Sequence, residues 1–293
     1  MTKEQMKILK KNQNERMLVL ERIKRLEKIG KESFFQDVEN DPPSKTLAPN
    51  DVDYLKKKIS SKIKGAIANV MTVWYQKNAI KNHKIEVRGI EHLQNIPSGA
   101  IIISNHFSAD ENMAIKTAVD KARPKHKFYA VIREGNYFMS GAIGFGLKHF
   151  RTLPLSSNIQ TMMNFDKAIS KLLNKKSWIL IYPEQAMWWN YRKPKAFKVG
   201  AFYYAVKNNV PIVPMFVTMS DLNAFDSAGF PMQKYIVHIF PPIYKDNNLS
   251  VIENRADMLK TAHKLWVEKY EEYYGVMLDY DGSNFIQPLN FDD

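Results

Sequence analysis

The chain of 293 residues contains no cysteine. This absence excludes a disulfide framework, a thiol nucleophile and a metal site built on cysteine thiolates. It is compatible with a reducing compartment, although it does not require one. The chemistry of the chain must therefore rest on other side chains.

Long apolar runs are also missing. No stretch reaches the roughly eighteen uninterrupted apolar residues that a membrane-spanning helix needs. The first eleven residues are charged and lack the apolar core of a secretory signal. We therefore expect a soluble or peripheral protein rather than an integral one.

What the chain does have is an excess of positive charge on an ordinary globular composition. Lysine and arginine number 43 against 30 acidic residues, and 45% of the residues are hydrophobic. This composition argues against global disorder. The charge indicates a polyanionic partner, which could be nucleic acid, anionic lipid or a phosphorylated substrate. Because no nucleic-acid-binding motif occurs, we expect no nucleic-acid partner; a non-catalytic basic lipid- or nucleic-acid-binding protein remains the alternative.

The amino-terminal part, residues 1–48, is predicted to be a basic helical arm followed by a linker. Residues 1–31 have a helical pattern, and Thr2 with Gln5 resembles a capping box. An apolar strip indicates a helix that either packs on protein or faces lipid. Prolines then predict a linker over residues 38–50. The strip consists of Leu20, Ile23 and Leu26.

Residues 49–82 are predicted to form an amphipathic helix that Asn50 or Asp51 caps. Apolar residues at three- and four-residue spacing share one face, and lysines occupy much of the remainder. Such a helix either packs its apolar stripe on the core of the protein or lies at a lipid interface. The apolar positions are Leu55, Ile59, Ile63, Ile67, Val70, Met71 and Trp74, and the lysines include Lys56, Lys57 and Lys58.

From about residue 83 to residue 293, short β-rich runs alternate with helical runs. This alternation predicts an α/β fold, with a mixed central sheet covered by helices. The predicted strands are Lys84–Val87, Ala100–Ser104, Lys127–Ile132, Ser177–Tyr182, Ile212–Thr218 and Lys234–Phe240. The predicted helices are Glu111–Val119, Ile159–Leu173, Lys198–Lys207 and Val251–Tyr273.

The most informative segment follows the apolar strand Ala100–Ser104, where a turn presents His106. Side chains just past the carboxyl end of such a strand lie where open α/β sheets bind ligands. A histidine at that place can take a proton from a substrate. Either Asp110 or Glu111 could orient the imidazole, as the acid does in a serine-protease triad. No serine nucleophile is needed if the base activates the substrate's own hydroxyl.

Asn105 and His106, with Glu111 five residues after the histidine, resemble the Asn-His-x4-Asp motif of the glycerolipid acyltransferases, the lysophosphatidic acid acyltransferase family. Further segments follow in the order of that family, and the resemblance covers roughly residues 83–245. The third motif departs most, because Gln, Ala and Met stand at positions 185–187 where Gly, Thr and Arg are usual. The further segments are Phe150–Pro154, Ile181–Gln185, Lys198–Ala201 and Val210–Pro214.

The resemblance implies transfer of a fatty acyl group from a thioester to the hydroxyl of a lysophospholipid. Lysophosphatidic acid, giving phosphatidic acid, is the first expectation; another lysolipid or glycerol phosphate is the alternative. His106 would be the general base and Glu111 its orienting acid. Arg151 would grip the acceptor phosphate. The full set of implied substrate-binding residues is Asn105, Arg151, Glu184, Lys193 and Lys198, with Arg192 and Lys195 as further candidates for the missing arginine.

Because such an acceptor partitions into bilayers, the implied activity favours a lipid-docking role for the second helix. We expect a peripheral protein on the cytoplasmic face of an anionic membrane. The donor would be acyl-coenzyme A or acyl-acyl carrier protein, used as a co-substrate, with no bound cofactor and no metal. The predicted docking residues are Lys56, Lys57, Ile59, Ile63, Ile67 and Trp74.

Overall fold

The computed structural model describes residues 3–39, 45–282 and 288. Within them, seven strands form one sheet in the order β1-β7-β6-β2-β5-β3-β4. Neighbouring strands run parallel except β6 and β7, which are antiparallel, so the predicted mixed sheet is confirmed. The strands are β1 (Glu86–Arg88), β2 (Ala100–Ile103), β3 (Phe128–Ile132), β4 (Thr152–Pro154), β5 (Trp178–Ile181), β6 (Ile212–Phe225) and β7 (Pro231–Ile239).

The central strand β2 is apolar at every position because both faces of the sheet are covered. Ile101 and Ile103 enter one core, whereas Ala100 and Ile102 enter the other. A half-exposed strand would alternate apolar with polar residues, but a parallel strand buried on two sides cannot. This burial fixes β2 between β5 and β6 and determines where the chain emerges at residue 104.

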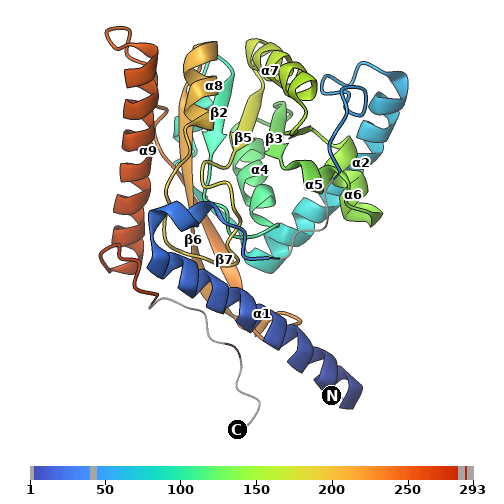
Figure 1. The fold of residues 1–293 in the computed structure, drawn as a ribbon, viewed down its shortest axis with the longest axis vertical. Coiled ribbons are helices and arrows are strands. Elements are labelled where there is room, and N and C mark those ends of the chain that lie inside the picture. The colour runs from blue at the N-terminus through green and yellow to red at the C-terminus, as the bar shows by residue number, and fades with distance from the viewer. Residues whose placement is uncertain (1–2, 40–44, 283–287, 289–293) are drawn as a thin grey trace.

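Helices cover both faces of the sheet (Figure 1). One core contains side chains of α7, α8 and α9, and the other contains side chains of α2, α3 and α4. In Figure 1, α9 and α2 lie at opposite sides of the molecule. The bounds are α2 (Ile59–His83), α3 (Glu91–Gln94), α4 (Glu111–Ala122), α5 (Glu134–Tyr137), α6 (Gly141–His149), α7 (Ile159–Asn174), α8 (Gly200–Asn208) and α9 (Val251–Tyr274).

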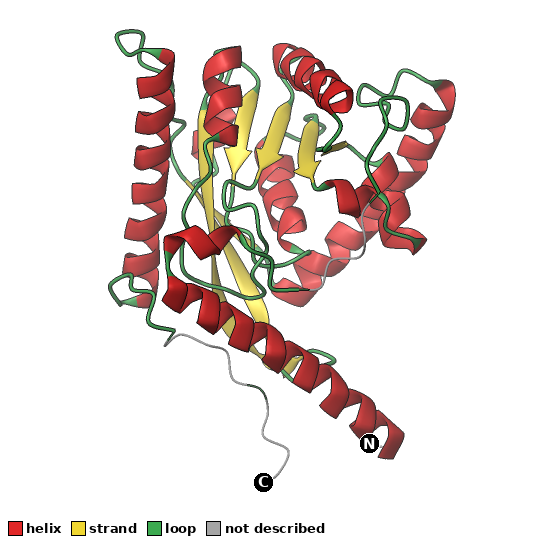
Figure 2. Cartoon of the chain, viewed as in Figure 1, coloured by secondary structure: helices red, strands yellow, loops and turns green. Residues whose placement is uncertain are grey.

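The amino-terminal helix α1 (Lys3–Ile29) and the short helix η1 (Lys31–Phe35) lie beyond the carboxyl ends of the strands. Figure 2 shows the arrowheads of the central strands pointing toward this side. The apolar strip of α1 is buried against the domain, in a third cluster that includes Trp188 and Phe230. The strip therefore packs on protein rather than facing lipid. Thr2, half of the expected capping box, lies outside the described residues.

The prediction that Asn50 or Asp51 caps the second helix is wrong, since α2 begins at Ile59. Lys56 has a φ of 50°, a left-handed conformation that a continuous helix cannot contain. The carboxylate of Asp53 accepts hydrogen bonds from the backbone N–H groups of residues 57 and 58. The segment before α2 is therefore a turn. The short elements α3, α5, α6 and β4 were not predicted from the sequence.

Among the residues that the structure describes, no helix is both long enough and apolar enough to cross a bilayer.

Candidate active site

Asn105, the first residue of the motif, acts as an extension of the sheet. Its side-chain amide donates to the carbonyl of Val217 at 3.0 Å, and its carbonyl oxygen accepts from the N–H of Val217 at 2.8 Å. The side chain is buried, and Val217 lies in β6. Asn105 therefore fixes the chain just after β2 to the neighbouring strand. This corrects the expectation that Asn105 binds substrate, because both ends of its amide are used within the protein.

His106 and Glu111 form the hydrogen-bonded pair that the motif predicts. Nδ1 of His106 contacts Oε1 of Glu111, and the carboxylate also accepts from the N–H groups of Phe107, at 2.5 Å, and Ser108, at 2.8 Å. Glu111 is fully buried, whereas the His106 side chain is 18% exposed. Since a carboxylate only accepts, Nδ1 carries the hydrogen and Nε2 holds the lone pair. Glu111, not Asp110, is the acid behind the histidine.

The imidazole ring is held from one side by an aromatic neighbour. Tyr182, which directly follows β5, stacks on His106 with ring centroids 4.0 Å apart and planes 12° from parallel. The hydroxyl of Tyr182 donates to Oδ1 of Asn112 at 2.9 Å, which fixes the phenol ring in turn. Among the described residues, no hydrogen bond to Nε2 is present. Nε2 is thus available on an imidazole whose other contacts are satisfied.

Glu184 is buried next to His106, and its carboxylate is hydrogen-bonded to other residues of the protein. Its carboxylate accepts from the N–H of His106 at 3.0 Å and from the N–H of Lys195 at 2.8 Å. The Nζ of Lys195 is 3.7 Å away, and both side chains are buried. Burial raises the pKa of Glu184 and lowers the pKa of Lys195 to about 8. Glu184 therefore positions His106, and its carboxylate is used within the protein rather than for the predicted substrate binding.

The basic residues after the third motif have structural partners too. Lys193 is buried and contacts Glu27 of α1 at 2.6 Å and Asp279 at 3.0 Å. Arg192 contacts Asp221 at 2.5 Å. Lys193 thus ties the amino-terminal arm to the carboxyl-terminal segment, which corrects its assignment to substrate binding. Lys195 is the cation that lies against Glu184.

Arg151 does not lie beside His106. It precedes the amino-terminal end of β4, whereas His106 follows the carboxyl end of β2. Strands β3 and β5 separate β4 from β2, and all four run in the same direction. Three strand spacings amount to roughly 14 Å across the sheet alone. The expectation that Arg151 grips the acceptor phosphate is therefore wrong for an acceptor bound at His106.

Two cations do lie at the same edge of the sheet as His106. Arg133 directly follows β3, and its guanidinium forms an exposed ion pair with Asp37 at 2.7 Å. Lys198 is exposed, its N–H donates to the carbonyl of Pro183 at 2.9 Å, and its Nζ lies 3.9 Å from the ring centroid of Phe35. Arg133 was not predicted from the sequence. The signal was available, because Arg133 follows an apolar strand just as His106 does.

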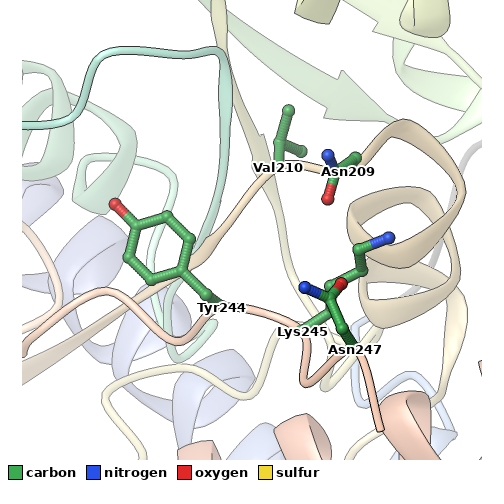
Figure 3. Close-up of a pocket in the computed structure, with 5 residues that line it drawn as sticks. All are labelled: Asn209, Val210, Tyr244, Lys245 and Asn247. Atoms are coloured by element: carbon green, nitrogen blue, oxygen red, sulfur yellow. The ribbon is translucent and has the colours of Figure 1, made fainter. Parts of the chain in front are cut away.

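One small surface pocket lies away from His106. It has a volume of about 160 Å³ and is lined by Asn209 and Val210, before β6, and by residues of the loop that follows β7 (Figure 3). Because Val210 precedes β6, this pocket lies at the opposite edge of the sheet from His106. It is therefore not part of the His106 site.

A mixed sheet with a buried acid hydrogen-bonded to a histidine after a central parallel strand defines an α/β protein with a candidate active site at the carboxyl edge of that strand. Residues 84–218 match the family model described as Acyltransferase. Over these residues the match confirms the predicted resemblance to acyltransferases.

Among solved structures, the chain is similar to the 1-acyl-sn-glycerophosphate (LPA) acyltransferase PlsC from Thermotoga maritima. The two share 14% sequence identity with a TM-score of 0.50, over 77% of this chain and 87% of that one. The likeness between them is one of fold. No curated protein matches the chain in sequence.

Proposed function

We propose that the chain transfers a fatty acyl group from a thioester to the free hydroxyl of a lysophospholipid, with His106 as general base. The observation that carries the proposal is the His106–Glu111 pair, which lies within the residues that match the Acyltransferase model and in which no described residue is hydrogen-bonded to Nε2 of His106. A histidine oriented in this way is suited to take a proton from an alcohol.

In the proposed reaction, Nε2 of His106 takes the hydroxyl proton as the acceptor oxygen attacks the thioester carbonyl carbon. The carbon–sulfur bond then breaks, and the imidazolium returns the proton to the departing thiolate. Glu111 stabilises the imidazolium during the step, and Tyr182 keeps the ring in plane. An ester and a free thiol are the products. The donor is acyl-coenzyme A or acyl-acyl carrier protein.

Lysophosphatidic acid is the acceptor that the surrounding charge favours. Arg133 and Lys198 are exposed cations at the edge of the sheet where His106 lies, and guanidinium matches phosphate oxygens in geometry. The ion pair of Arg133 with Asp37 is solvent-exposed, so a phosphate can exchange for the carboxylate at small cost. The similar Thermotoga maritima protein is titled an LPA acyltransferase, which supports the same choice.

A panel of acceptors tests the function. We expect purified protein, given an acyl thioester, to add one acyl group to lysophosphatidic acid, with weaker use of phosphate-free monoacylglycerol, as measured by mass spectrometry. Arg133→Ala should raise the KM for lysophosphatidic acid by about tenfold through loss of a charge-assisted hydrogen bond. Arg151→Ala is the matched control and should leave that KM unchanged. No acylated product from any acceptor would overturn the function; equal KM changes in both variants would overturn only the phosphate assignment.

The membrane-docking role of α2 is part of the proposal. Its outward face exposes Ile59, Ile63, Ile67, Val70 and Trp74, with Ile59 75% and Trp74 67% exposed. The opposite face packs against α4 and α6. Soluble proteins rarely expose an apolar stripe of this size without a partner for it.

The charge around this stripe supports an anionic lipid surface as the proposed partner. Between Asp53 and Glu86 the sequence contains eight lysines and no acidic residue. Lys57 and Lys58 are exposed, whereas the half-buried Lys56 donates to the carbonyl of Lys148 at 3.3 Å. Lysines beside an apolar stripe combine electrostatic attraction with insertion below the headgroups. We propose a peripheral protein on the cytoplasmic face of the membrane.

Replacing Ile63 and Ile67 together by Asp should reduce binding to anionic vesicles by at least about tenfold, because two apolar anchors are lost and two like charges face the lipid. Vesicle co-sedimentation measures the effect. The matched control is Val251→Asp with Ile252→Asp on α9, two exposed apolar residues at the opposite side of the molecule. Quenching of Trp74 fluorescence by brominated lipid, with Trp74→Phe as baseline, reports insertion directly. Equal binding by both double variants would contradict the docking face.

A further inference from the structure

A second polar cluster lies beside the His106–Glu111 pair and is formed mainly by α2. Asp110 directly precedes α4, and its Oδ2 contacts Nε2 of His83 at 3.0 Å. Its other oxygen, Oδ1, accepts from the hydroxyl of Tyr75. His83 is buried, and its Nδ1 contacts the carbonyl of Gln233 at 2.8 Å. One carboxylate therefore receives two side chains of a single helix, one near its middle and one at its end.

The cluster is built tightly. Tyr235 of β7 stacks on the ring of His83 with centroids 4.1 Å apart and planes 6° from parallel. The N–H of Asp110 donates to Oγ of Ser108 at 3.1 Å. Burial acts against the charge of Asp110, but the hydrogen bonds from His83 and Tyr75 outweigh it and lower the pKa of Asp110. The carboxylate stays ionised and keeps hold of both α2 side chains near neutral pH.

The position of Asp110 in the sequence connects this cluster to the His106–Glu111 pair. Asp110 is the residue immediately before Glu111, and both lie at the start of α4. Glu111 has no solvent exposure and holds the 106–108 loop through three hydrogen bonds. A shift of Asp110 by a fraction of an ångström is therefore a shift of Glu111. Tyr75 also adjoins Trp74 of the exposed face, so α2 touches solvent on one side and this carboxylate on the other.

We propose that Asp110 is a positioning residue through which the seating of α2 on a lipid surface sets the geometry of the His106–Glu111 pair. The proposal rests on the proposed function. Lipid binding to the outward face steadies α2, and α2 then holds Asp110 through Tyr75 and His83. The membrane then gives the acyltransferase access to its substrate, and membrane binding also sets its turnover.

Asp110→Asn is the variant that tests the link, because it keeps the size of the side chain and weakens both contacts. We expect kcat on vesicle-borne acceptor to fall by about tenfold, with KM and vesicle affinity unchanged, as a small misplacement of a catalytic pair predicts. The rate advantage of vesicles over a detergent-dispersed acceptor should shrink with it. Tyr75→Phe should lower kcat less, and adding it to Asp110→Asn should lower kcat no further.

The matched control is Asp120→Asn, at the other end of α4. Asp120 also receives a side chain of α2, Gln76 at 3.0 Å, and it pairs with Lys116. This variant breaks a comparable contact between the same two helices away from His106, so its thermal midpoint should fall while kcat stays unchanged.

Equal kcat in the Asp110→Asn and Asp120→Asn variants would overturn the positioning role and make Asp110 a structural residue. A fall in kcat for Asp110→Asn with an unchanged vesicle advantage would overturn the link to the membrane. Either failure leaves the proposed function intact as long as the unaltered protein acylates the acceptor and His106→Ala does not. Absence of turnover in the unaltered protein would be a failure of the function itself.

Discussion

Replacement of His106 by alanine is expected to lower kcat by about 10³-fold, within the range that loss of a general base produces. Nε2 of His106 carries the lone pair that accepts the hydroxyl proton, and Glu111 and Tyr182 orient the ring. The thermal midpoint and vesicle binding should change little, because the side chain is partly exposed and does not belong to the docking face. Initial rates of acylated product, quantified by mass spectrometry, measure the effect.

The control for loss of an imidazole is His92→Ala on α3, away from the carboxyl edge of β2. It should retain the rate of the unaltered protein. If His106→Ala also keeps a near-normal rate, another group removes the hydroxyl proton and the assignment of the base is wrong.

The second large effect is expected in stability, from the Glu184–Lys195 pair. Glu184→Gln leaves the buried Lys195 without its counter-charge, and Lys195→Met leaves the buried carboxylate in the same state. Each change should lower the free energy of unfolding by about 3 kcal/mol, the lower part of the range for breaking a buried ion pair. Urea unfolding measures the change. Burial raises the pKa of Glu184 and lowers the pKa of Lys195, so it opposes the charged form of both groups. The ion pair is therefore held by its geometry, and its two charges together add no net stability.

The double variant that combines Glu184→Gln with Lys195→Met separates this explanation from simple loss of packing. With no charge left to bury, it should recover most of the stability that either single change removes, because buried ion pairs are often replaceable by neutral side chains. Losses that simply add in the double variant would show that the electrostatic coupling is negligible.

The sequence was most informative where the chemistry is local. The strand Ala100–Ile103 is apolar throughout, so its burial and its end could be predicted from the sequence. Glu111 follows His106 by only five residues, so their contact could be predicted as well. The choice between Asp110 and Glu111 was not readable. It depends on which acid faces Tyr75 and His83, and those residues come from a helix about thirty residues earlier.

Long-range register explains most of the errors. Arg151 matched a motif in order, but its distance from His106 depends on the place of β4 in the sheet, three strands from β2. Lys193 and Glu184 looked like binding residues because a charge near a motif suggests a ligand. Their partners, Glu27 and Lys195, are themselves charged and buried, and only tertiary packing brings them together.

For the amphipathic helix, too, one feature could be predicted from the sequence and another could not. Spacing placed Ile59, Ile63 and Ile67 on one face, and the structure leaves that face exposed. Where the helix begins was not predictable from apolar spacing, because the left-handed Lys56 interrupts a pattern that the apolar residues continue.

The dependence of thiol release on the acceptor hydroxyl shows whether the acyl group passes directly to that hydroxyl with the help of His106. Free thiol from the acyl thioester is followed continuously with a chromogenic reagent, in the presence of lysophosphatidic acid or of its deoxy analogue. We expect rapid release with the hydroxylated acceptor, and only background release with the deoxy analogue or in the His106→Ala variant. Release at equal rates with both compounds would show that water or a protein group accepts the acyl chain, and would contradict the account.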